Sequence, residues 1–104
     1  MRLIATIILG AAASVVLAST PASASGTISC KAGPQSGWKS QQVLTTKLTK
    51  KGWVVRKSKV DGGCYEVYGT TPEGDRVEAY FHPVTLEKLY VARRGKVLFR
   101  RDGY

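Results

Sequence analysis

The sequence predicts an α+β fold in which one N-terminal helix packs on a four- to five-stranded antiparallel meander sheet. Three observations lead to this prediction. Apolar residues follow a helical spacing between 40 and 52. The stretch 76–81 alternates between apolar and polar side chains, which is typical of a strand with one buried face. Turn residues separate further short stretches rich in β-branched and aromatic residues, which favours consecutive hairpins. One helix followed by hairpins builds two packed layers.

The first 24 residues resemble a secretory signal peptide. Arg2 is followed by the uncharged apolar stretch 3–18 and then by Ala22-Ser23-Ala24, an A-x-A cleavage pattern. The apolar stretch is shorter than the roughly 20 residues of a membrane span and rich in small residues. We therefore expect cleavage after Ala24, a secreted or periplasmic location and no membrane span afterwards. The remaining residues, 25–104, are enough for one small domain and exclude a multidomain enzyme.

The segment 25–37, called the lead-in segment below, is irregular and rich in small residues. It is expected to be held to the domain only by Cys30. Cys30 and Cys64 are the two cysteines of the chain, and in an exported protein they are expected to form one disulfide. A redox C-x-x-C spacing is absent, and the leucine usual three residues before a lipidated cysteine is missing ahead of Cys30.

The helix is expected to span 41–51. Ser40 can cap its first turn, and good helix formers follow. Gly52 can adopt the left-handed conformation that often ends a helix. The apolar stripe is narrow, so the helix should cover another layer rather than form a core itself. The stripe consists of Val43, Leu44 and Leu48.

Up to five short strands are expected after the helix. They are 53–60, 64–68, 76–81, 88–92 and 97–100. Turn signals separate them, and the strongest is Asp61-Gly62-Gly63, a hairpin signature. Within the third strand, Val77, Ala79 and Phe81 share one side and are expected to face the core.

Charge is distributed in three blocks. Residues 31–60 carry eight Lys and Arg and no acid, 61–87 carry six acids against Arg76, and 88–104 carry six Lys and Arg against Asp102. The formal net charge of the chain is +9. A basic exported protein is attracted to anionic lipid, cell-wall polymers, nucleic acid or acidic proteins alike.

The basic residues of the C-terminal extension and of the helix end are the candidate anion-binding site. They lie on one positive surface if the last two strands pair as a hairpin that returns toward the helix end. In the competing interpretation the charges only protect an edge strand from aggregation. The candidates are Arg93, Arg94, Lys96, Arg100, Arg101, Lys47, Lys50 and Lys51.

The one histidine, His82, ends a strand and precedes a proline, so we expect it to cap a turn. One catalytic hypothesis remains, a small secreted endoribonuclease with Glu66 as base, His82 as acid and Arg76 as phosphate holder. Against it, Glu66 alternates with the apolar Val67 and is expected on the solvent side. We therefore predict no catalytic residue, no cofactor and no metal site. Without a recognised motif, nucleic acid is not expected as a partner.

Five pieces of the sequence occur in a characteristic order and spacing. They are Leu48 with Gly52-Trp53-Val54-Val55, Asp61-Gly62-Gly63, Cys64-Tyr65-Glu66-Val67-Tyr68, Gly74 with Arg76-Val77-Glu78, and Phe81-His82-Pro83-Val84-Thr85. Over about 38–91 they resemble a PepSY domain, in the small exported single-domain form found in bacteria. The family's last piece usually reads Asp-Pro-x-Thr-Gly, so His82 stands in place of Asp and Leu86 in place of Gly.

The resemblance implies a PepSY-like domain over 38–104, with a basic C-terminal extension from Arg93 that the family pattern does not cover. It implies a non-catalytic, cofactor-free module that contacts or restrains another exported protein, of which a peptidase is one example. The alternative function is a basic protein that adsorbs to an anionic cell-envelope polymer or lipid.

Overall fold

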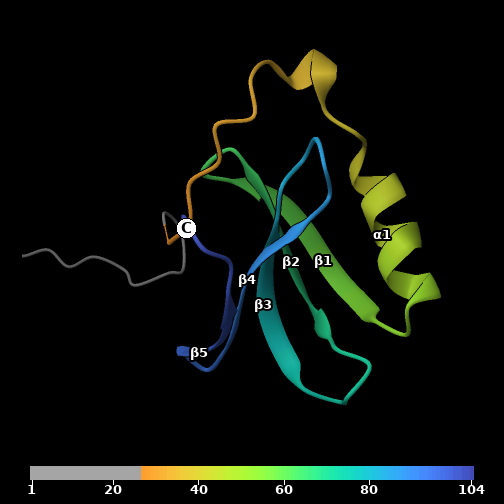
Figure 1. The fold of residues 1–104 in the computed structure, drawn as a ribbon. Coiled ribbons are helices and arrows are strands. Elements are labelled where there is room, and N and C mark those ends of the chain that lie inside the picture. Colours follow the sequence, from red (N-terminus) through yellow and green to blue (C-terminus); the bar gives the residue numbers. More distant parts are fainter. Residues whose placement is uncertain (1–26) are drawn as a thin grey trace, which may run out of the picture.

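The structure is a computed structural model that describes residues 27–104. A short 3-10 helix, η1 (Gln35–Gly37), precedes the α-helix α1 (Gln41–Lys50). The strands are β1 (Val54–Asp61), β2 (Cys64–Thr70), β3 (Arg76–Phe81), β4 (Lys88–Arg93) and β5 (Lys96–Arg100). They form one antiparallel sheet in the order β1-β2-β3-β4-β5, beside α1 (Figure 1). The predicted signal peptide lies outside the described residues.

The predicted α+β class is confirmed, with one α-helix and a five-stranded antiparallel meander among the described residues. The α-helix does not stand at the N-terminus of the described part, because the segment 27–40, which contains η1, precedes it. The strand bounds agree with the sequence prediction to within two residues at each end. This agreement follows from the turns, whose residues mark the ends of each hairpin.

Helix α1 begins and ends where its capping residues predict. The Ser40 hydroxyl accepts a hydrogen bond from the Val43 amide at 3.0 Å, and Gly52 has a φ of +97°. Leu44 and Leu48 are buried, but Val43 is 48% exposed, so its place in the predicted apolar stripe is wrong. Leu44 and Leu48 are four residues apart and share one face, whereas Val43 is turned about 100° away from Leu44.

One hydrophobic cluster lies on the face of the sheet beside α1. Leu44 and Leu48 of α1 belong to it together with residues of three strands, β2, β3 and β4, and of two connecting segments. The predicted core side of β3 is confirmed, since all three of its apolar residues are in this cluster. Its members are Leu44, Leu48, Trp53, Tyr65, Val67, Val77, Ala79, Phe81, Leu86 and Val91.

A second, smaller cluster lies on the opposite face, where Ile28 of the lead-in segment packs against Tyr80 and Tyr90. The C-terminus lies beside the start of the described chain (Figure 1), and Tyr104 packs against the same cluster. The predicted Cys30–Cys64 disulfide is confirmed. The prediction that Cys30 alone holds the lead-in segment is wrong, because Ile28 is also buried, with 2% of its surface exposed.

The hairpin turn between β1 and β2 explains how the lead-in segment comes so close. Gly62 and Gly63 have φ values of +62° and +79°, which glycine adopts without strain. A Cβ atom on Gly62 would collide with the carbonyl oxygen of Ile28, and one on Gly63 with that of Cys30. The Cys30 amide donates to the Gly62 carbonyl at 2.8 Å. The backbone of the lead-in segment can therefore approach the turn only because glycines occupy both turn positions.

The loop between β3 and β4 differs from the family pattern in its residues. It still forms a turn whose backbone amides are capped by a side chain. His82 Nδ1 accepts hydrogen bonds from the amides of Val84 at 3.1 Å and Thr85 at 3.4 Å, so its predicted turn-capping role is confirmed. Leu86 has a φ of +63°, in the left-handed region that costs a residue with a Cβ roughly 1–2 kcal/mol. Its side chain is only 5% exposed, and burial of a leucine contributes about 1.5–3 kcal/mol in return.

Candidate functional site

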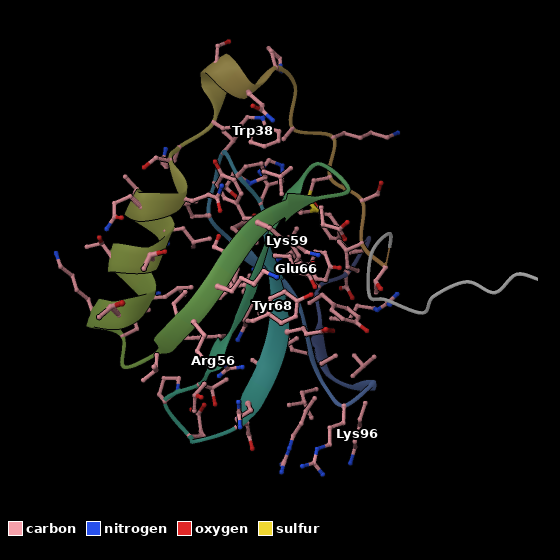
Figure 2. All side chains as sticks on the ribbon, turned by 180° about the vertical axis from the view of Figure 1, so that it is seen from behind. Trp38, Arg56, Lys59, Glu66, Tyr68 and Lys96 are labelled. Carbon is pink, nitrogen blue, oxygen red and sulfur yellow. A yellow bond between two sulfur atoms is a disulfide. The ribbon has the colours of Figure 1, made fainter. Side chains whose placement is uncertain are left out.

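A polar cluster occupies the sheet face opposite α1. It consists of Lys59 on β1, Glu66 and Tyr68 on β2, and Glu78 on β3. The tight turn at Gly62-Gly63 sets the register that pairs Lys59 with Glu66, and the next hairpin pairs Tyr68 with Glu78. Lys59 Nζ lies 3.7 Å from Glu66 Oε1 and 5.8 Å from the centre of the Tyr68 ring. Figure 2 shows Lys59, Glu66 and Tyr68 close together on β1 and β2.

The prediction that Glu66 faces solvent is wrong, because its side chain is completely buried. The alternation of side chains along β2 does place Glu66 on the face opposite Val67, but other residues cover that face. Lys59 and Tyr80 lie opposite Glu66 on the two neighbouring strands, and the lead-in segment covers another part of the same face. Among the described residues, neither carboxylate oxygen has a hydrogen-bond partner of acceptable geometry. The ion pair with Lys59 partly compensates for its burial.

Burial and nearby carboxylates keep Tyr68 of the cluster and the neighbouring Tyr80 neutral. Burial, with the neighbouring Glu66 carboxylate adding to the effect, raises the pKa of Tyr68 to about 12. Burial and a hydrogen bond to Asp61, 2.8 Å long, raise the pKa of Tyr80 well above its ordinary range. Burial and the charge of Glu66 also raise the pKa of Glu78, and Lys59 partly offsets this. Phenols whose pKa is raised in this way are poor proton donors near neutral pH.

Replacing Glu78 with Gln should stabilise the protein at neutral pH. A raised folded-state pKa means that the folded protein holds this proton more tightly than the unfolded chain does. The resulting stability is present below the ordinary carboxyl pKa of 4.5 and is lost as pH rises through the higher folded value. Glu78→Gln should therefore raise the free energy of unfolding by about 0.5 kcal/mol at pH 7. The free energy of unfolding of this variant should also depend less on pH in this window. Urea unfolding between about pH 4 and pH 8 measures this.

Glu73→Gln is the matched control, because it removes the same charge from an exposed turn. If both variants change stability equally at every pH, the effect is one of net charge, and the proposed repulsion between Glu66 and Glu78 is wrong.

The candidate ribonuclease residues are not brought together. Arg76 is at the start of β3, where it pairs with Thr70, and His82 directly follows the end of β3. An extended strand rises about 3.3 Å per residue, so the two residues lie roughly 20 Å apart. Glu66 pairs with Tyr80 near the His82 end and is buried. Within 27–104, no group of three or more His, Cys, Asp or Glu residues is arranged to hold a metal ion.

The candidate anion-binding residues are divided among several places. Arg93 and Arg94 line a hollow with Arg76 near the β4–β5 turn, and Arg93 pairs with Asp75 at 3.1 Å. Lys96 lies at the tip of the same hairpin (Figure 2). On the sheet face away from α1, the Arg100 guanidinium lies 5.2 Å from the centre of the Tyr90 ring and donates to the Tyr104 carbonyl. Lys50 lies with Val43 on the outer side of α1.

The remaining three candidates, Lys47, Lys51 and Arg101, are brought to one place. With Lys88 they line a hollow of about 320 Å³ between α1, the β3–β4 loop and the C-terminal end of β5. We call this hollow the cationic hollow. Its apolar wall includes Trp53 and Leu86. Sequence reasoning did not include Lys88, although the predicted return of the last strand toward the helix end was a signal for it. The structure thus unites part of the predicted set.

Comparisons with known proteins give one match. The family model of the peptidase propeptide and YPEB domain, the PepSY family, matches residues 8–90, which include α1, the first three strands and the start of β4. Searches of the curated proteins and of the solved structures returned no significant match. No helix within 27–104 is long and apolar enough to cross a membrane. Since the family model covers most of the sequence and the pieces that resembled it follow one another from α1 to the β3–β4 loop, the chain belongs to the PepSY family.

Proposed function

We propose that the protein is an exported, non-catalytic binding module that contacts or restrains another exported protein, with a peptidase as the first candidate. The observation that carries this proposal is the family match, which spans the helix and the first three strands. The Cys30–Cys64 disulfide is consistent with an exported protein, because disulfides persist mainly in oxidising compartments.

The positions of the residues with catalytic potential favour a non-catalytic role. The imidazole of His82 is occupied in capping a turn. Glu66 is buried beside Lys59, and Arg76 lies at the other end of β3 from His82. A general acid and base must reach the same substrate atoms, and this arrangement does not bring the three side chains to one point. The residues therefore serve the fold, which supports the proposal against a ribonuclease.

The alternative proposal is adsorption to an anionic envelope polymer or lipid. It is favoured by the formal net charge of +9 and by the four basic side chains around one hollow. Such binding depends on charge rather than on a particular partner structure. It weakens steeply with salt, because dissolved ions screen the attraction between exposed charges.

A pull-down from the exported fraction of the host distinguishes the two proposals. The full chain, tagged at its C-terminus and exported by its own host, should retain a specific protein, expected to be a peptidase, at about 150 mM salt. The retained peptidase should cleave a fluorogenic peptide more slowly when the purified protein is added back. Recovery of anionic glycan or lipid without protein would contradict the binding-module proposal and favour adsorption.

A further inference from the structure

The cationic hollow has an unbalanced charge. Its rim carries four basic side chains, from Lys47, Lys51, Lys88 and Arg101, against one lining acid, Glu87. Glu87 and Arg101 form only a long, exposed ion pair of 4.0 Å. No ion pair among the described residues involves the three lysines. Three cations therefore face the same space without an acidic partner.

Some of these cations are held in place before any ligand arrives. Arg101 donates through Nε to the Lys88 carbonyl at 3.0 Å and through its amide to the Leu89 carbonyl at 2.8 Å. Lys88 Nζ lies 4.5 Å above the centre of the Phe99 ring. Charges that are already positioned lose less conformational entropy on binding. This distinguishes the hollow from a set of freely moving surface lysines.

The floor beneath the charges is apolar and includes Leu86, one of the two non-glycine residues with a positive φ within 27–104, the other being Arg94 in the β4–β5 turn. Trp53 and Leu86 line the hollow, and both are at least nine-tenths buried. Leu86 keeps its side chain there although its φ of +63° disfavours any residue with a Cβ. Backbone strain of this kind persists where the surroundings hold it in place, here through the packing of Leu86 in the cluster beside α1, and such residues are frequent at functional sites. A ligand with an apolar group between two acidic groups would match floor and rim together.

The hollow continues toward the open edge of the sheet. A larger hollow of about 670 Å³ shares Lys51, Trp53 and Lys88 with it and reaches Leu98 and Phe99. Leu98 is 44% exposed. β5 is an edge strand, so its outer backbone groups are free to pair with an added chain. The space therefore suits an extended peptide better than a compact small molecule.

We propose that this surface binds an extended acidic segment of a partner protein, in which Glu or Asp residues flank a large apolar side chain. The apolar side chain packs on the exposed parts of Trp53 and Leu86 and on Leu98 in the adjoining hollow. The flanking carboxylates pair with the four basic side chains of the rim. This proposal rests on the proposed binding function and gives it a surface and a partner chemistry.

Fluorescence anisotropy with a labelled peptide tests the proposal. The probe is a short peptide with one phenylalanine between pairs of glutamates, added to the purified full-length protein. The triple variant Lys47→Gln, Lys51→Gln, Lys88→Gln should bind it about tenfold more weakly. The control triple Lys31→Gln, Lys57→Gln, Lys96→Gln carries the same net charge and should lose less than about twofold. Thermal unfolding of both variants confirms that they are folded.

Control peptides separate the apolar contact from charge alone. Replacing the phenylalanine with serine, or the glutamates with glutamine, should each weaken binding to the wild type about tenfold. Equal losses in the two triple variants, or undiminished binding of the serine peptide, would overturn the proposal. The proposal would also be overturned if the peptide does not bind and the three lysines are instead required for binding to anionic phosphatidylglycerol vesicles. If the pull-down still retains a peptidase with the hollow triple variant, the binding-module function stands and this surface is wrong.

Discussion

Replacing both cysteines, Cys30→Ala with Cys64→Ala, should lower the free energy of unfolding by about 3–4 kcal/mol. The bond joins residues 34 positions apart and so restricts a long loop of the unfolded chain. A small domain has a total stability of roughly 5–15 kcal/mol, so the loss removes a large share of it. The melting temperature should fall by at least about 12 °C, which circular dichroism measures directly.

The loss should begin in the lead-in segment. Ile28 and the Cys30 amide are held against the Gly62-Gly63 turn on the face that contains Tyr80. Without the disulfide, the Cys30 amide should exchange its hydrogen faster than amides in the middle of β2. Reduction of the wild type should reproduce the shift of the double variant. If the free energy of unfolding of the double variant lies within about 1 kcal/mol of that of the oxidised wild type, burial of Ile28 is enough to hold the lead-in segment on the sheet.

Most of the fold could be predicted because its signals are local. The Gly62-Gly63 turn and the alternation in 76–81 lie within single hairpins, and both were found where expected. The same turn also specifies that Lys59 lies opposite Glu66, since a two-residue hairpin loop sets the register. The ion pair was thus within reach of sequence reasoning, although it was not predicted.

The burial of Glu66 and the cationic hollow could not be predicted in this way. Periodicity assigns Glu66 to a face but does not reveal that a segment without periodicity, the lead-in segment, covers part of that face. The hollow joins Lys47, Lys88 and Arg101, which come from a helix, a strand and the C-terminal end. Their meeting depends on how these elements pack, and no short-range pattern encodes it. Only the charge blocks and the predicted return of the last strand toward the helix end indicated part of it.

The conformation of Leu86 leads to a second large expected effect, in which glycine should be better than alanine. Leu86→Ala removes a buried side chain from the helix-side cluster and should cost about 3 kcal/mol. Alanine also keeps the strain of a positive φ, because it still has a Cβ. Leu86→Gly removes the same packing but releases the strain, so it should be about 1 kcal/mol more stable than Leu86→Ala. Urea unfolding of both variants measures the difference.

The order should reverse at Leu44, which is equally buried but lies within α1. There glycine should be about 1 kcal/mol less stable than alanine, because glycine is the poorer helix former. Comparing the two pairs removes the cost of the lost leucine, which is common to the alanine and glycine variants of each site. If glycine is the worse substitution at both positions, Leu86 is not strained, and the strain cannot support a binding role for the cationic hollow. If the orders are opposite, the chain keeps a leucine at a position where glycine would relax the backbone, because its side chain is buried in the cluster beside α1, where it also borders that hollow.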